Sequence, residues 1–231
     1  MPEMSTMIVL FALSVTVLGI AKMRRTRGDA PMFHKKKDTM LTADDLAKKP
    51  GRVQRNSSKA DLENLLVMLL RFTKKKNLRV VCPGSVQHEG RKCGATMLLV
   101  GEFGVQSIHC YGFGGSVSPA DSGYDWEQTM NGETKVIMNP VQANTEDNSL
   151  LRQALDANGC KDVPVYSCGV FTQGDVQLNA GPTSGLYTSR QFKAWLDSGA
   201  LAERGSRVAD VQALTDLLAN LAGIPEMKKK K

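Results

Sequence analysis

The chain has 231 residues, of which 42% are hydrophobic and 23% are charged, which excludes a largely disordered protein and favours one folded domain with extensions. The net charge of +7 is unevenly distributed. Residues 22–37 contain seven basic residues against Asp29, the last four residues are lysines, and residues 95–158 are rich in Asp and Glu. The basic excess therefore does not predict a basic groove on the folded domain.

Residues 4–21 carry no charge and predict a transmembrane helix. Eighteen helical residues span about 27 Å, close to the thickness of the hydrocarbon core. A cleaved signal peptide is the main alternative, but no basic residue precedes the apolar run, and Lys22 and Met23 follow it directly. The pattern favours a retained anchor.

The orientation of this anchor follows from its flanks. Four basic residues follow the apolar run within six positions, and none precede it. The positive-inside rule then places the rest of the chain in the cytoplasm, as a single-pass protein of the cell membrane. The same basic cluster can also lie against anionic lipid headgroups.

The five cysteines agree with a cytoplasmic location. Their number is odd and none form a CxxC pair, so neither a disulfide framework nor a zinc knuckle is indicated. We expect buried free thiols in a reducing compartment. The cysteines are Cys82, Cys93, Cys110, Cys160 and Cys168.

Residues 22–57 are basic and polar and predict a flexible linker, with one short helix at residues 41–48. Residues 58–224 predict the folded domain, and residues 225–231 a lysine-rich tail. Within the domain, helices are predicted over 61–73, 140–155, 189–198 (with Ser189 as N-cap) and 208–221, and strands over 78–82, 95–100, 105–111, 163–171 and 176–178.

The connections between these elements carry further predictions. Gly101 and Gly104 flank a tight hairpin turn between two strands. Val117 and residues 135–138 are expected to form short strands on either side of a polar loop that holds Asp125-Trp126. Asn139-Pro140 is expected to open a helix. The order of elements predicts an α/β domain with a mixed central sheet flanked by helices.

Several short motifs resemble one known family. They are the run Leu99-Val100-Gly101-Glu102-Phe103-Gly104-Val105, then Ile108, Gly115, Trp126 and Asn139-Pro140-x-Gln142-x-Asn144, followed by Pro164-Val165 and Gly169-Val170-Phe171. In order and spacing they resemble the nuclease-related domain, NERD, over roughly residues 61–196. The resemblance implies a fold similar to that of the PD-(D/E)xK nucleases, and many NERD proteins carry a membrane helix.

The positions that would carry catalysis depart from the family pattern. A PD-(D/E)xK site has an acidic residue on one strand and an Asp or Glu two positions before a Lys on the next, so that carboxylates hold Mg²⁺. The resemblance places these positions at Thr96, His109 and Tyr111. A hydroxyl, an imidazole and a phenol do not form such a site, so no catalytic or metal-binding residue is assigned.

Other residues offer weaker alternatives for a site. Glu63 stands on the early helix, where the family carries glutamates, and Glu102 and Glu89 with Lys92 lie in turns. His109 stands beside Cys110, but neighbours on a strand point to opposite faces, so a metal would need further ligands such as Cys93 or His88. The same residues are also explained without a site, as charged side chains that face solvent and as a histidine packed within a strand.

These observations leave two main hypotheses. The first is a membrane-anchored, NERD-like binding domain without nuclease catalysis, whose partner is nucleic acid or protein. A weaker form of this hypothesis is a membrane-surface adaptor that binds protein. No small-molecule cofactor is expected. The alternative is a Mg²⁺-dependent nuclease that cleaves DNA or RNA with a rearranged site. Nucleic acid would be bound electrostatically. The candidate contacts are Lys74, Lys75, Lys76, Arg79, Arg91 and Lys92.

Overall fold

The computed structural model describes residues 57–74, 76–121 and 123–225. The predicted membrane span at 4–21, the short helix at 41–48 and almost all of the predicted linker and lysine tail lie outside these residues. None of the helices in the described ranges combines the length and hydropathy that a membrane span requires.

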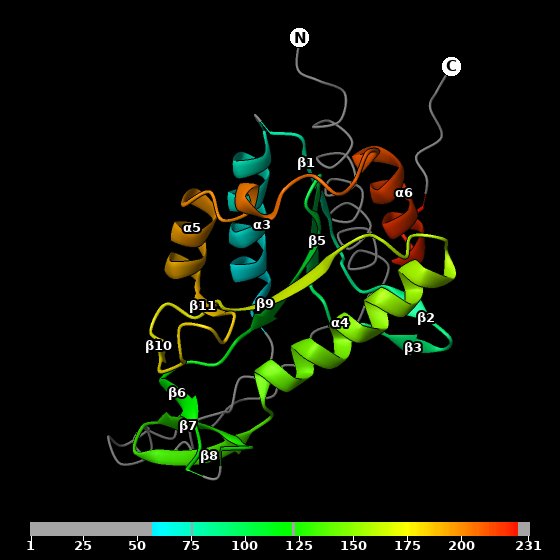
Figure 1. Cartoon of the computed structure of the whole chain (residues 1–231). Helices are drawn as coiled ribbons and strands as arrows, with labels where there is room; N and C mark the ends of the chain where they lie inside the picture. Colours follow the sequence, from blue (N-terminus) through cyan, green and yellow to red (C-terminus); the bar gives the residue numbers. More distant parts are fainter. Residues whose placement is uncertain (1–56, 75, 122, 226–231) are drawn as a thin grey trace, which may run out of the picture. The chain divides into compact units, whose positions relative to one another are not determined.

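The described residues form an α/β domain, as predicted, around a five-stranded mixed sheet of order β1-β4-β5-β9-β11 (Figure 1). The first three strands pair antiparallel, whereas β5 with β9 and β9 with β11 pair parallel. The strands are β1 (Leu78–Val81), β4 (Met97–Gly101), β5 (Gly104–Tyr111), β9 (Val165–Phe171) and β11 (Leu186–Thr188).

A tight turn joins β4 to β5, and Gly101 pairs with Gly104 at its base, which confirms the predicted hairpin. Gly104 has a φ of 114°, and a Cβ atom there would lie 2.2 Å from the carbonyl oxygen of Pro164. The neighbouring Val105 N–H donates to this same oxygen at 2.9 Å. Glycine is therefore required where β5 begins to run alongside β9.

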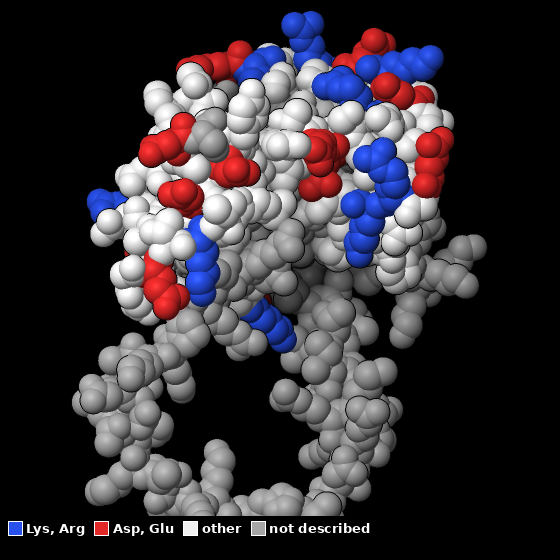
Figure 2. Space-filling model, turned by 90° about the horizontal axis from the view of Figure 1, so that it is seen from below, with Lys and Arg blue, Asp and Glu red and all other residues white. Residues whose placement is uncertain are grey.

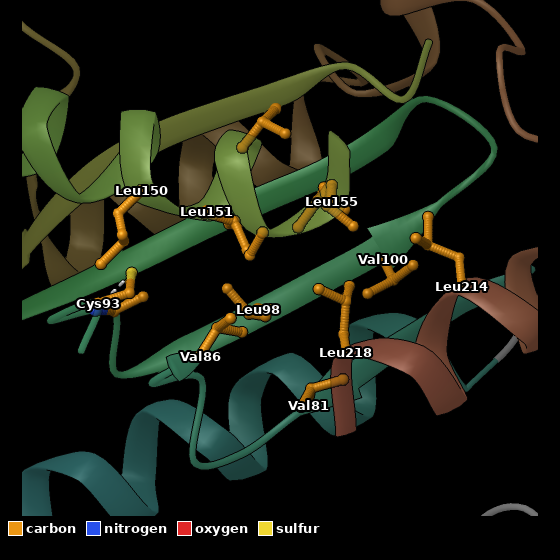
Figure 3. Packing of buried hydrophobic residues seen from close by; sticks show 14 of the residues in the cluster. Val81, Val86, Cys93, Leu98, Val100, Leu150, Leu151, Leu155, Leu214 and Leu218 are labelled. Carbon is orange, nitrogen blue, oxygen red and sulfur yellow. Dashed lines mark hydrogen bonds between the residues drawn. The ribbon is translucent and has the colours of Figure 1, made fainter. Parts of the chain in front are cut away.

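Helices cover both faces of the sheet. Figure 1 shows α3 (Lys59–Thr73) and α5 (Ser189–Asp197) on one side and α4 (Pro140–Ala157) and α6 (Val211–Leu221) on the other. Figure 3 shows leucines of α4 and α6 meeting aliphatic side chains of the sheet in a buried cluster. The labelled residues are Val81, Val86, Cys93, Leu98, Val100, Leu150, Leu151, Leu155, Leu214 and Leu218.

A second, four-stranded sheet has the order β10-β6-β7-β8, and here the prediction of a polar loop around Trp126 was wrong. Trp126 begins β7, and its side chain is buried because it faces an aromatic cluster with Tyr111 and Phe171. Asn131-Gly132, with φ of 54° and 79°, forms the two-residue turn from β7 to β8. The strands are β6 (Ser116–Pro119), β7 (Trp126–Met130), β8 (Glu133–Ile137) and β10 (Gln177–Leu178).

A short hairpin of β2 (Gln87–His88) and β3 (Arg91–Lys92) was not predicted either. Its two turn residues, Glu89 and Gly90, have φ of 48° and 74°, the left-handed values of a two-residue hairpin turn. The strands are only two residues long, which is too short for a recognisable alternation of side chains.

Three helix starts differ from prediction. Helix α3 begins at Lys59, two residues before the predicted start. The N-cap of α5 is Thr188 and not Ser189, because the Thr188 hydroxyl accepts from the Gln191 N–H while the Gln191 side chain accepts from the Thr188 N–H. Helix α6 begins at Val211, after the N-cap Asp210. Val208, the predicted start, instead donates its N–H to the carbonyl oxygen of Glu102.

We predict that Gly104→Ala lowers the free energy of unfolding by about 2 kcal/mol or more, because the added methyl group meets Pro164 and the φ is left-handed. Denaturant unfolding of the full chain in detergent, followed by tryptophan fluorescence, measures this. Gly181→Ala is the control, since its Cβ has nothing within 4 Å. Equal effects of the two substitutions would contradict the close approach of β5 to Pro164.

Candidate functional site

The three positions that the resemblance assigns to a metal site come together at one end of the β4–β5 pair. Met97 pairs with Ile108, so Thr96 lies opposite His109, and its N–H donates to the carbonyl oxygen of Ile108 at 2.8 Å. His109 and Tyr111 are two residues apart on β5 and share one face of the sheet. That face is the one covered by α4.

His109 is buried beneath α4, with 3% of its surface exposed. Its Nδ1 lies 3.4 Å from Oδ2 of Asp147, which α4 supplies. The Asp147 carboxylate also passes over Gly94, where a Cβ atom would lie 2.6 Å from Oδ2. A glycine at position 94 therefore leaves room for the carboxylate that reaches His109.

Tyr111 forms the second link to α4. Its hydroxyl donates to Oδ1 of Asn144 at 2.6 Å and also lies 3.3 Å from the carbonyl oxygen of Pro140. A Cβ atom at Gly169 on β9 would lie 2.9 Å from the Tyr111 ring and 3.1 Å from Nδ2 of Asn144. Each of the two contacts with α4 thus lies against a glycine, Gly94 or Gly169, where any larger side chain would collide with it.

Burial determines the charge of these groups. It lowers the pKa of His109 to about 4, although the nearby Asp147 carboxylate acts in the opposite direction. The imidazole is therefore neutral at pH 7. Burial likewise raises the pKa of the Tyr111 phenol, with a smaller contribution from Asp147. A neutral phenol and a neutral imidazole occupy the positions at which the family pattern has a lysine and an acidic residue.

Ser107, His109 and Asp147 form a row that has the order of a nucleophilic triad. The Ser107 Oγ lies 3.4 Å from Nε2 of His109, and its hydroxyl donates to the carbonyl oxygen of Tyr166 at 3.1 Å. However, Ser107 is 0% exposed. A substrate cannot reach its oxygen, so the row links α4 and β9 to β5 and does not form an active site.

The metal alternative gains no support from the described residues, in which no group of three or more His, Cys, Asp and Glu side chains could hold an ion. The five cysteines are free. Burial raises the pKa of Cys93 to about 11 and that of Cys110 to about 12, so both thiols are protonated at neutral pH and are poor nucleophiles.

The glutamates considered for a rearranged site lie apart from His109. Glu63 is on the exposed side of α3 and pairs with Lys59 at 3.6 Å. Glu102 lies in the β4–β5 turn, where its carboxylate accepts from Asn77 at 3.0 Å. Glu89 is at the exposed tip of the β2–β3 hairpin. The structure brings none of these three carboxylates to the His109 end of β5.

The predicted nucleic-acid contacts fall into two groups at opposite ends of β1 (Figure 1). Lys74 caps α3, and Lys76 places its Nζ 3.5 Å from the centroid of the Phe72 ring, while Arg79 on β1 donates to the carbonyl oxygen of Leu78. The other group, Arg91 and Lys92, is exposed on β3. Lys75 lies outside the described residues.

Comparison with protein-family models, with curated proteins and with solved structures finds no match for this chain. Two residues of the buried links, Ser107 and Asp147, were not singled out by sequence reasoning. The available signal was spacing: Asn144 and Asp147 are three apart on a predicted helix, so they share a face, as His109 and Tyr111 share a face of a strand.

We predict that folding stability falls as the pH is lowered from 6.5 towards 4, because the unfolded chain takes up a proton on His109 that the folded chain does not. His109→Asn should flatten this dependence by on the order of 1 kcal/mol per pH unit. Denaturant unfolding at a series of pH values measures it. An unchanged slope for His109→Asn would show that His109 is protonated in the fold.

Proposed function

We propose that this chain is a membrane-anchored, NERD-like binding protein whose domain does not catalyse nuclease chemistry. One observation carries the proposal: His109 and Tyr111, at the positions of the family's metal site, are buried and bonded to Asp147 and Asn144 of α4. A phosphodiester and its metal ion have no room between β5 and a helix that is already bonded to the strand.

The architecture supports the nuclease-like part of the proposal. A PD-(D/E)xK site needs two neighbouring strands, and β4 and β5 are such a pair, flanked by helices on both faces. The chemistry of the side chains supports the loss of catalysis. Mg²⁺ prefers carboxylate oxygens, and among the described residues no group of three or more possible metal ligands lies at this end of the strands, where Asp147 stands next to a buried neutral histidine.

A protein is a better partner for the described domain than nucleic acid. Residues 57–225 contain 15 basic and 17 acidic residues, so the domain lacks the basic excess that binding to phosphates requires. The candidate basic contacts are also divided between two ends of β1, with no continuous stripe. We therefore place nucleic acid second and protein first among the partner classes.

The membrane part of the proposal comes from residues 4–21 and from the basic residues that follow them. It accounts for the uneven charge, because the basic excess lies in the segments that would adjoin an anionic membrane surface, outside the domain. A tether of this kind raises the local concentration of the binding domain near partners at the same membrane.

We predict no metal-dependent cleavage when the full chain in detergent is incubated with single- and double-stranded DNA and with RNA, in Mg²⁺, in Mn²⁺ and with chelator. The measurement is product formation on denaturing gels. Cleavage that disappears with chelator, and also in the variant Asp147→Asn, would establish the rearranged nuclease instead. Cleavage that survives in that variant would point to a contaminating enzyme, and a second purification would then decide the question.

We predict that a cysteine introduced by Met40→Cys is not labelled by an impermeant thiol reagent in intact cells, but is labelled after the membrane is permeabilised. The reason is the positive-inside orientation of the anchor. The parent chain, which keeps its five native cysteines, gives the background signal. Strong labelling of the variant in intact cells would place the domain outside the cytoplasm.

A further inference from the structure

Arg204 is a half-buried cation held against the five-stranded sheet. It ends η1 (Ala202–Arg204), a short turn of helix in the segment, orange in Figure 1, that leads from α5 to α6. Its Nη1 donates to Oε1 of Gln106 on β5 at 2.8 Å, and Gln106 is 0% exposed. Gln106 stands three residues before His109, so it points to the face of the sheet opposite to α4. Its amide also donates to the carbonyl oxygen of Ser107 at 3.0 Å, so a fixed group orients the guanidinium.

Three aromatic rings lie next to this guanidinium. Its Cζ is 3.8 Å from the centroid of the Tyr166 ring, 5.4 Å from that of Trp195 and 5.8 Å from that of Phe103. Tyr166 on β9 pairs with Gln106, so the ring and the amide lie side by side on one face of the sheet. A cation within about 6 Å of a ring centroid is attracted by the face of the ring. The rings and the amide together hold the guanidinium in one place.

The aromatic rings of this region are partly open to solvent. Tyr166, Tyr187 and Trp195 are each half-buried. The rings of Tyr187 and Trp195 stack with centroids 5.7 Å apart, and both pack against the buried ring of Phe192. In the described part of the chain the only other half-buried aromatic side chain is Phe72, so such rings are concentrated here. Tyrosine, tryptophan and arginine are the residues enriched at the positions that dominate binding energy in protein interfaces.

The positive charge of Arg204 has no acidic partner among the residues that the structure describes, since none of the ion pairs there includes it. Within the same residues its Nε and Nη2 make no hydrogen bond, yet they are not buried without a partner, so they contact solvent. Burial lowers the pKa of Arg204, because desolvation disfavours the charged form. A carboxylate at this point would accept from the free donors and offset the cost of desolvation.

We propose that Arg204 and the rings around it form a docking site for a carboxylate side chain of a partner protein, in a segment with apolar residues on either side of the carboxylate. Nε and Nη2 lie on one edge of the guanidinium and match the two oxygens of a carboxylate. The half-buried rings of Tyr166, Tyr187 and Trp195 would bury apolar area against the flanking residues. This proposal rests on the proposed function of the domain as a binding module, and it specifies the surface and the chemistry of the partner.

The same features disfavour other occupants. One guanidinium carries a single charge, which one carboxylate neutralises, whereas recognition of phosphate groups in proteins generally uses clusters of arginines. On the described residues of the face that Figure 2 shows, Lys and Arg side chains are intermingled with Asp and Glu side chains, with no broad basic surface for a nucleic-acid backbone. The rings extend the site beyond the guanidinium, so an acidic residue with apolar neighbours gains more than a free carboxylate ion does.

The test uses the full chain in detergent and a fluorescent peptide of about nine residues, with glutamate at its centre and leucine and phenylalanine on either side, and binding is followed by anisotropy. We expect saturable binding, about ten-fold weaker for the matched peptide with glutamine at the centre. Arg204→Gln should remove this preference for glutamate, and Arg204→Lys, which keeps the charge without the two-donor edge, should restore only part of it. Arg152→Gln, at an exposed residue of α4 on the other side of the sheet, should keep the preference in full.

Three outcomes would overturn the proposal: no binding of the glutamate peptide, equal binding of the two peptides, or a preference for glutamate that Arg204→Gln leaves intact. Single-stranded DNA that displaces the peptide from the parent chain and does not bind Arg204→Gln would assign the site to phosphate instead. Dimers of the free chain that Arg204→Gln dissociates in sedimentation would assign it to a second copy.

Two further measurements keep these outcomes distinct. The tryptophan unfolding transition checks that each variant is folded, and if Arg204→Gln does not fold, the comparison of Arg204→Lys with Arg152→Gln decides the question. The cleavage assay separates the proposed function from this inference. Absence of cleavage together with absence of peptide binding refutes only the docking site, whereas metal-dependent cleavage refutes the proposed function whatever the peptide does.

Discussion

The buried contacts between β5 and α4 are the constraint on which the rest of the domain depends. His109 and Tyr111 carry polar atoms into the interior, and leaving such an atom without a partner costs about 1–3 kcal/mol. Asp147 and Asn144 meet this demand from the same face of α4. The later strand residue, Tyr111, contacts the earlier helix residue, Asn144, and His109 contacts Asp147 one helical turn further on. The helix therefore runs antiparallel to β5, and these two contacts fix its distance from the strand.

This placement of α4 determines the course of the chain after the helix. A helix antiparallel to β5 returns the chain to the starting end of β5, and β9 can then run parallel to it. Gly104, Gly169 and Gly94 each permit one close approach in this arrangement, to Pro164, to the Tyr111–Asn144 link and to Asp147 respectively. The packed aliphatic cluster between α4, α6 and the sheet supplies the apolar part of the same interface. Polar links give the interface its register, and apolar burial gives it most of its stability.

The sequence predicted the parts of this fold in which local pattern and burial agree. The apolar runs predicted as strands over 95–100 and 105–111 are β4 (Met97–Gly101) and β5 (Gly104–Tyr111), which are buried almost throughout, and the Gly101–Gly104 spacing identified their turn. In the second sheet, short strands were predicted at Val117, 135–138 and 176–178, but β7 was not, because its polar residues Glu127 and Thr129 resemble loop residues, although Asn131-Gly132 marked the turn. The partners of His109 and Tyr111 could not be identified, because no local pattern shows which face of a helix meets which strand. The positions to which the resemblance would assign a metal site, in contrast, can be named from the sequence, and so can the mismatch between their residue types and a Mg²⁺ site.

Asn139 connects the buried contacts of α4 with the turn before β7. Its side-chain oxygen accepts from the N–H groups of Val141 and Gln142, so it caps α4, and its amide nitrogen donates to the carbonyl oxygen of Tyr124. The helix that covers His109 therefore begins at the residue that also holds the turn beside β8. Residues 139–144, which are part of the resemblance, thus have structural roles that do not need a metal: Asn139 caps α4, Pro140 begins the helix and Asn144 accepts a hydrogen bond from the Tyr111 hydroxyl. Each of these contacts stabilises the fold, so the domain has a structural reason to keep these residues whether or not it has a catalytic site.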